Sequence, residues 1–371
     1  MRFIGREGFA GLLTLLAEQG YEVIGPTVRD GAVVLDRIDG AQDLPRGVRE
    51  TQGPGAYRLE QTGDDRLFAW AHGPDAAKRF LFPPRETIQT GHRDLGGRIT
   101  VTPAPLPDVR YAFVGLRSCD LHAIEVQDRV FLAADPAYRT RREQAIFIGV
   151  NCGHPGATCF CVSMGTGPRC ATGFDIALTE LDDGFTAEIG TPAGATLLDE
   201  VRAVAATDAQ RAESLSTTEV AAGRMGRALE TTDLPGLLHR NAEHPRWNEV
   251  GARCLTCTNC TMVCPTCFCH DLSDGISLDG AEATRQREWA SCFSEEFTHM
   301  ASGGVRASNA SRYRQWLTHK FDAWHLQFGT SGCVGCGRCI TWCPVGIDVT
   351  EEIAAIRLTD GEVRINEEVL V

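Results

Sequence analysis

The first apolar stretches of the chain predict a helix followed by a hairpin. Apolar residues in 9–17 recur at a spacing that places them on one helical face, and Gly20 ends the pattern. Two short apolar runs follow, at 21–25 and 32–36, on either side of the dipeptide Asp30-Gly31. An Asp-Gly pair between such runs is typical of a tight turn. We therefore expect two antiparallel strands after the first helix.

A second pattern predicts parallel strands. Continuous apolar runs at 111–114 and 146–150 indicate buried strands, and helical patterns cover 121–129 and 135–142 between them. This β-α-β order predicts an α/β N-terminal domain whose sheet is at least partly parallel. Asp120 precedes the first of the two helices and is expected to cap it.

The C-terminal part of the chain has a helical pattern instead, which covers 281–297 and 311–328. A stretch with two prolines and a glycine, 231–245, marks the boundary before it. We therefore expect an α/β domain over 1–235 and a mainly α-helical domain over 236–371. The basic residues of these helical stretches are expected on solvated faces, with a subunit contact as the alternative: Arg285, Arg287, Arg312, Arg314 and Lys320.

Composition narrows the class of protein. The 371-residue chain is 43% hydrophobic and 23% charged, enough for more than one packed core. Its formal net charge of −13, without any basic cluster, argues against nucleic acid as a partner. The N-terminus carries charge too early for a secretory signal, and no apolar stretch approaches the length of a membrane span. We expect a cytoplasmic protein with no membrane partner, whose 16 cysteines are metal ligands and not disulfides.

Eight of these cysteines form two copies of one motif. The stretches 254–265 and 333–344 each have the spacing C-x2-C-x2-C-x3-C-P. In this motif the first three cysteines bind one [4Fe–4S] cluster, and the fourth ligates the cluster of the other copy. The sequence therefore predicts two [4Fe–4S] clusters side by side. The expected ligands are Cys254, Cys257, Cys260 and Cys343 for cluster 1, and Cys333, Cys336, Cys339 and Cys264 for cluster 2.

The main alternative for this motif is structural zinc, because four-cysteine zinc sites also contain C-x2-C pairs. Zinc ribbons, however, use two pairs separated by a loop, whereas here four cysteines are bunched and followed by proline in both copies. The pattern favours iron–sulfur clusters. The alternative to an electron-transfer protein is a protein of another functional class, in which the metal stabilises the fold or senses redox state.

A further cluster is a hypothesis for the N-terminal domain. Cys119 and Cys152 each follow one of the two predicted buried strands, and parallel strands bring the residues after their carboxyl ends to one edge of a sheet. Cys159 and Cys161 come soon afterwards. These four thiols are candidate ligands, although cysteine is also a common small buried residue. Cys170 is the expected spare.

Three more cysteines form an incomplete set. Cys267 and Cys269 lie in the tetrapeptide Thr-Cys-Phe-Cys, which also occurs at 158–161, and Cys292 lies in a Ser-Cys-Phe stretch. The candidates for a fourth ligand are His270 and a cysteine of the N-terminal domain; the alternative is that the set has no fourth ligand. These thiols are candidate ligands of one more cluster, or they are packing and hydrogen-bonding neighbours of another.

Together these stretches resemble a known family. The chain is similar to the beta subunit of cytoplasmic NAD(P)-linked [NiFe] hydrogenases, also called sulfhydrogenases, and the A subunit of anaerobic sulfite reductase is similar too. The resemblance spans nearly the whole chain. It rests on residues 115–120, 151–161, 164–168, 254–269, 291–293, 319–321 and 333–339.

The resemblance implies an α-helical dicluster ferredoxin domain and an electron-transfer role. The subunit would relay electrons between a flavin/NAD(P)-binding subunit and a [NiFe] catalytic module. The corresponding subunit of a sulfite or sulfur reductase is the alternative, and neighbouring genes would separate the two. The chain has no G-x-G-x-x-G after a strand, no G-x4-G-K-[ST], and no paired C-x2-C at both ends of the sort that a nickel-bearing subunit needs. We therefore expect flavin and nickel on other polypeptides and no catalytic residue here.

Overall fold

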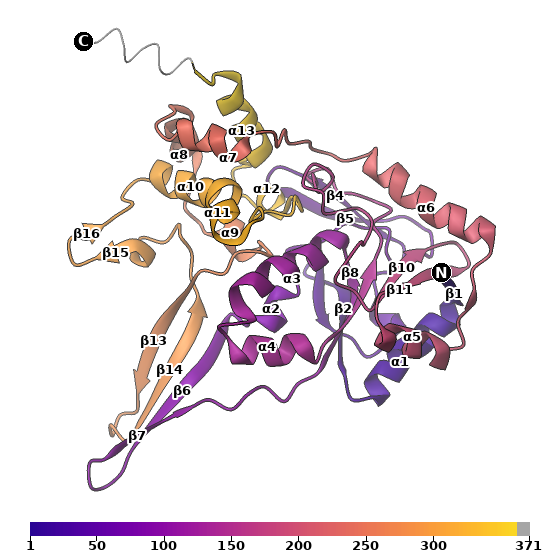
Figure 1. Cartoon of the computed structure of the whole chain (residues 1–371), viewed down its shortest axis with the longest axis horizontal. Helices are drawn as coiled ribbons and strands as arrows, with labels where there is room; N and C mark the ends of the chain where they lie inside the picture. Colours follow the sequence, from indigo (N-terminus) through magenta and orange to yellow (C-terminus); the bar gives the residue numbers. More distant parts are fainter. Residues whose placement is uncertain (362–371) are drawn as a thin grey trace.

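An eight-stranded mixed sheet is the centre of the N-terminal half (Figure 1). This computed structural model describes residues 1–361. In spatial order the strands are β12 (Val204–Ala205), β1 (Arg2–Gly5), β11 (Gly184–Ile189), β10 (Ile176–Glu180), β9 (Ile146–Val150), β8 (Tyr111–Leu116), β2 (Glu22–Arg29) and β3 (Ala32–Arg37). The central strands β2, β8, β9 and β10 pair in parallel. The predicted β-α-β unit and its parallel pairing are confirmed.

Helices cover both faces of this sheet (Figure 1), and the first buries the apolar face that the sequence predicts, including Phe9 and Leu12. The β2–β3 hairpin turns at Asp30 and Gly31, both with positive φ, as predicted. The helix predicted after Asp120 begins earlier, at Ser118, so Asp120 lies in its first turn instead of before it, and its carboxylate accepts a hydrogen bond from the backbone N–H of the N-cap residue Arg117. The helices are α1 (Arg6–Glu18), α2 (Lys78–Leu81), α3 (Ser118–Phe131), α4 (Pro136–Glu143), α5 (Pro192–Glu200) and α6 (Asp208–Ala222).

The cysteine-rich half packs its helices around an aromatic core that includes Trp247, Tyr313 and Trp316. The predicted helix over 311–328 is confirmed, although five residues in its middle form a π-helical turn, η3 (His319–Ala323). The helices are α7 (Leu234–Arg240), α8 (Arg246–Arg253), α9 (Asn259–Met262), α10 (Asn309–Thr318), α11 (Trp324–Phe328), α12 (Arg338–Thr341) and α13 (Val349–Leu358).

The prediction of a helix over 281–297 is wrong, so the C-terminal half is less helical than expected. The strands β13 (His270–Ile276) and β14 (Glu282–Trp289) form a hairpin there, closed by a turn at Asp279 and Gly280. β14 also pairs with β6 (Arg85–Arg93), which pairs with β7 (Ile99–Pro103), and this four-stranded sheet projects as an arm (Figure 1). Because β6 comes from the N-terminal half, local periodicity could not indicate the pairing.

Two smaller hairpins complete the described chain. β4 (Val48–Gly53) pairs with β5 (Ala56–Gln61), and β15 (His299–Met300) pairs with β16 (Gly303–Gly304). No helix among residues 1–361 is both long and apolar enough to cross a membrane.

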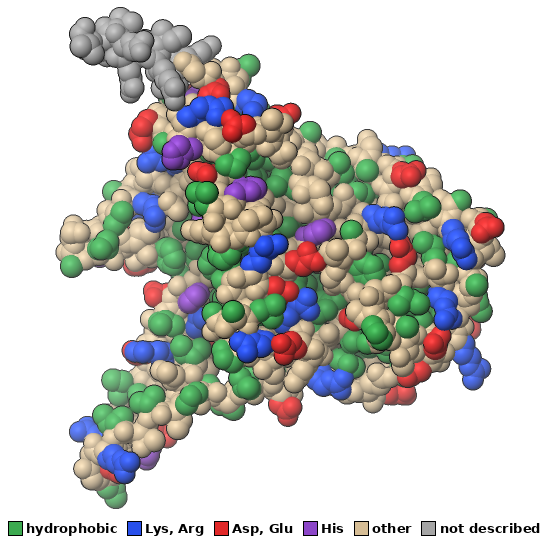
Figure 2. Space-filling model, viewed as in Figure 1, with side chains coloured by type: hydrophobic (Ala, Val, Ile, Leu, Met, Phe, Trp, Pro, Cys, Tyr) green, Lys and Arg blue, Asp and Glu red, His purple; other side chains and the backbone are tan. Residues whose placement is uncertain are grey.

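The solvated faces that the sequence predicts are only partly observed. Arg285 lies at the surface beside Asp274, and Figure 2 shows basic and acidic side chains interspersed over one face of the molecule. Arg287, Arg312 and Lys320 are buried, contrary to the prediction, and Arg314 is half-buried. Arg287 is buried because carboxylates of the N-terminal half pair with it, for example Glu86 at 2.6 Å.

Candidate metal-cluster sites

The first cysteine-lined cavity lies in the C-terminal half and encloses about 440 Å³. All four cysteines predicted to bind cluster 1 line it, together with Cys339 from the second motif. Aromatic and apolar side chains, including Tyr313 and Trp316, close the remaining walls. Two backbone N–H groups point at sulfur: Thr256 N lies 3.4 Å from Cys254 Sγ, and Ile347 N lies 3.3 Å from Cys343 Sγ.

The second cavity, of about 360 Å³, is lined by the four cysteines predicted to bind cluster 2. Among them is Cys264, which comes from the first motif, just as Cys343 of the second motif lines the first cavity. The structure thus has the crossed arrangement of fourth cysteines that the motif predicts. Cys339 lines both cavities, so the two sites are direct neighbours.

The second motif contains glycines at positions 335 and 337, which have no Cβ and so allow close approach of other backbone. Gly335 N does donate to Cys333 Sγ, at 3.4 Å. The closest neighbours of Gly335 and Gly337, however, belong to the N-terminal half. A Cβ atom on Gly337 would lie 2.3 Å from the carbonyl oxygen of Thr158, and one on Gly335 would lie 2.7 Å from Phe160. The motif therefore packs its backbone directly on residues 158–161.

The third cavity lies where those two halves meet. It encloses about 340 Å³ and is lined by the four N-terminal cysteines of the further-cluster hypothesis: Cys119, Cys152, Cys159 and Cys161. Cys336 of the second motif lines it as well. Because Cys336 also faces the second cavity, the three cavities form a continuous series.

Polar and sulfur-containing side chains that the sequence did not indicate surround the third cavity. His72 Nε2 lies 3.7 Å from Cys159 Sγ, and Met225 Sδ lies 3.8 Å from Cys161 Sγ. The buried guanidinium of Arg117 donates to the carbonyl oxygen of Phe68 at 2.9 Å and faces the cavity. The sequence alone could not have identified the histidine and the arginine as neighbours of these thiols, because only the fold brings them together.

The donor sets fit iron–sulfur clusters. Each cavity is lined by at least four cysteines from separate segments, and the three cavities are similar in volume. Among residues 1–361, no group of three or more Cys, His, Asp or Glu side chains is arranged to hold one metal ion. Burial raises the pKa of several of these thiols, to about 12 for Cys161 and Cys333. A cluster that binds these thiolates must therefore displace their protons.

The remaining candidate ligands line none of these three cavities. In the pairs Cys264–Cys267 and Cys269–Cys292 the two thiols interact, which lowers the pKa of Cys264 and Cys269 and raises that of Cys267 and Cys292. His270 is exposed, with Nδ1 3.1 Å from the carbonyl oxygen of Phe268. Cys170 is buried in the apolar core below the sheet edge.

Two buried lysines lie beside this thiol group. Lys320 Nζ is 3.2 Å from Cys264 Sγ, and the π-helical turn η3 directs it inward. Lys78 Nζ lies 3.2 Å from the carbonyl oxygen of Met262 and 3.8 Å from the centre of the Trp289 ring. The hydrogen bond from Cys267 and the charge of Lys320 hold the pKa of Cys264 well below its usual value.

An ion pair and hydrogen bonds fix the third cavity to the second. Arg338, between two cysteines of the second motif, is buried and pairs with Asp120 at 2.8 Å. Phe160 N donates to the carbonyl oxygen of Gly335 at 2.8 Å, and the hydroxyls of Thr158 and Thr341 are 2.7 Å apart. The relative placement of the cysteine segments is therefore set by contacts that do not involve metal.

Comparison with known proteins agrees with this arrangement. A family model described as a 4Fe-4S dicluster domain matches residues 253–347, which contain all eight cysteines of the two motifs. No solved structure matches the chain. Sulfhydrogenase 2 subunit beta of Pyrococcus furiosus is 32% identical over 310 residues, which cover 81% of this chain and 89% of that protein. This chain therefore belongs to the family of sulfhydrogenase beta subunits.

Proposed function

We propose that the chain is the iron–sulfur subunit that relays single electrons, in the cytoplasm, between a flavin/NAD(P)-binding subunit and a [NiFe] hydrogenase catalytic module. The family supports an electron-transfer subunit of a hydrogenase-type complex. The continuous series of three cysteine-lined cavities is the observation that carries the proposal.

In this proposal three [4Fe–4S] clusters are held by the thiols of the three cavities. When bound, a cluster supplies the uptake and release of one electron with little movement of its ligands. The ligands are Cys254, Cys257, Cys260 and Cys343 for the first, Cys333, Cys336, Cys339 and Cys264 for the second, and Cys119, Cys152, Cys159 and Cys161 for the third. A fourth cluster at Cys267, Cys269 and Cys292 stays a prediction.

The protein's own contribution is position, burial and charge. Cys339 and Cys336 each face two cavities, which keeps neighbouring clusters within short reach of each other. Apolar walls exclude water from the first cavity, and backbone N–H groups donate to ligand sulfur. Lys320 and Arg338 place buried positive charge beside the second cavity. These groups set the reduction potentials, and no side chain needs to move a proton.

A tagged copy of this chain tests the relay. We expect it to co-purify with a flavin-containing and a nickel-containing polypeptide, and the reconstituted complex to reduce NAD(P)⁺ with hydrogen. Omitting this chain should abolish NAD(P)⁺ reduction but leave dye reduction by the nickel-containing polypeptide intact. NAD(P)⁺ reduction at full rate without the chain would contradict the proposal. Co-purification of a sirohaem polypeptide would favour the sulfite reductase alternative.

A further inference from the structure

A large solvent-open cavity lies beside the third cysteine-lined cavity. It encloses about 1030 Å³ between β4, the carboxyl ends of β9 and β10, and α6. Ligands usually bind at this edge of parallel strands. Its charged and ionisable lining residues are Arg49, Arg66, Arg224, His154, Glu180 and Glu213.

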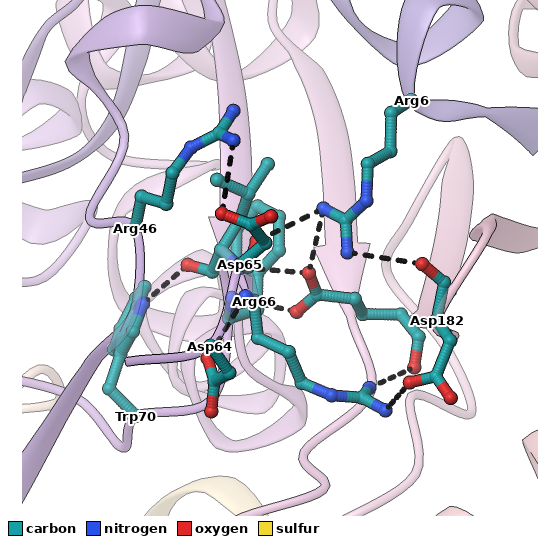
Figure 3. Close-up of polar contacts among 10 residues, drawn as sticks. Arg6, Arg46, Asp64, Asp65, Arg66, Trp70 and Asp182 are labelled. Atoms are coloured by element: carbon teal, nitrogen blue, oxygen red, sulfur yellow. Dashed lines mark hydrogen bonds and ion pairs between the residues drawn. The ribbon is translucent and has the colours of Figure 1, made fainter. Parts of the chain in front are cut away.

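One wall of this cavity is fixed by internal contacts. The Glu180 carboxylate accepts hydrogen bonds from the backbone N–H groups of Leu67 at 2.7 Å and Phe68 at 2.8 Å. Figure 3 shows Arg6 and Arg66 approaching this wall from two sides, with Asp182 at the Arg66 guanidinium. Glu180 and Arg66 therefore already have partners within the protein, and they form a rigid wall.

Arg49 and Arg224 differ from Arg66. Both are exposed, and among residues 1–361 neither side chain has an ion-pair or hydrogen-bond partner. They approach the same place, because both line this cavity together with His154. Glu213, the other carboxylate of the lining, offsets part of this charge. A chain with a net charge of −13 thus has a cavity with two guanidinium groups that no described residue pairs with.

This cavity and the third cysteine-lined cavity share one loop. Asn151, Gly153 and His154 face the polar cavity, and Cys152 between them faces the thiol cavity. The loop packs closely on α6, because a Cβ atom on Gly153 would lie 2.9 Å from Thr217 Cγ2. A ligand in the polar cavity is therefore separated from the Cys152 thiol by little more than one backbone segment.

We propose that this cavity binds a small oxyanion or carboxylate between Arg49 and Arg224, directly behind Cys152. Guanidinium groups bind such anions through paired charge-assisted hydrogen bonds. A second consequence rests on the proposed function: negative charge next to the third cluster disfavours its reduced form, so the ligand lowers its reduction potential.

Isothermal titration calorimetry with inorganic phosphate and with acetate tests the site, using the anaerobic holoprotein in a zwitterionic buffer of low ionic strength. We expect saturable binding of at least one of these probes, weakened about tenfold or more in the double variant Arg49→Gln, Arg224→Gln. The matched control is Arg58→Gln, an exposed arginine of β5 that does not line the cavity. No saturable binding, or equal weakening in the control, overturns the proposal and leaves an adventitious ion only.

A redox titration separates this proposal from the proposed function. With the binding probe present, the potential of the third cluster should fall in the wild type and stay constant in the double variant. If the probe binds but the protein holds no third cluster, the anion site stands and the proposed relay has only two clusters in this chain. A third cluster whose potential ignores the bound probe would overturn the electrostatic coupling alone.

Discussion

At the residue scale, buried positive charge beside cysteine is what sequence patterns missed. A helical pattern places Lys320 on a solvated face, because lysine is rarely buried. In the fold its ammonium group contacts Cys264 Sγ, Thr266 Oγ1 and the carbonyl oxygen of Gly332. Arg338 is buried in the same way by backbone carbonyls of Gly73 and Asp75. These partners come from distant segments, so only the fold reveals them.

The variant Lys320→Met tests the effect of this charge on the second cluster. A buried cation stabilises the reduced cluster, so its loss should lower one potential by on the order of tens of millivolts. Redox titration followed by EPR measures the change. Arg314→Gln is the control, because Arg314 lies on the preceding helix and pairs with Glu243 at the surface. Equal potentials in wild type and Lys320→Met would contradict this role.

Glu50 gives a pH-dependent prediction. Burial raises its pKa from 4.5 to about 7. Between these values the folded state binds the extra proton, so the free energy of unfolding falls as pH rises, by at most about 1.4 kcal/mol per pH unit. Glu50→Gln should remove this slope, as measured by anaerobic denaturant unfolding from pH 5.5 to 7.5. The exposed Glu60→Gln should keep it, and an unchanged slope in Glu50→Gln would refute the assignment.

At the element scale, segments with their own periodicity were predictable. The β-α-β unit and the first hairpin follow from local apolar runs and an Asp-Gly turn. The arm was not predicted, since β14 is polar on both faces and its partner β6 lies in the other half of the chain. A second Asp-Gly pair, Asp279-Gly280, was the overlooked signal.

The contact between the second motif and residues 158–161 can be tested with two glycines. Gly337 and Gly280 both have positive φ, at 75° and 68°, so alanine strains the backbone at either position by roughly 1 kcal/mol. Only Gly337 also meets a backbone oxygen at 2.3 Å, whereas Gly280 has open space around it. Gly337→Ala should therefore lose iron on purification, and Gly280→Ala should not. Equal iron contents would show that the contact does not position the cavities.

At the scale of the whole molecule, the grouping of thiols was predictable and their connection was not. Motif spacing predicted which eight cysteines belong together, and the sheet-edge rule placed Cys119 and Cys152 at one edge. That Cys336 faces two cavities depends on how the two halves pack through Arg338 and Asp120. No local sequence pattern predicts how the two halves pack, and this packing brings the separate cavities into one series.

Iron and acid-labile sulfide per chain, measured after anaerobic purification, test this series most directly. We expect about twelve iron atoms for the wild type and about eight for the double variant Cys119→Ser, Cys152→Ser. Cys170→Ser, which changes a buried cysteine outside the cavities, should keep about twelve. Unchanged iron in the double variant, or zinc in place of iron in the wild type, would contradict the account.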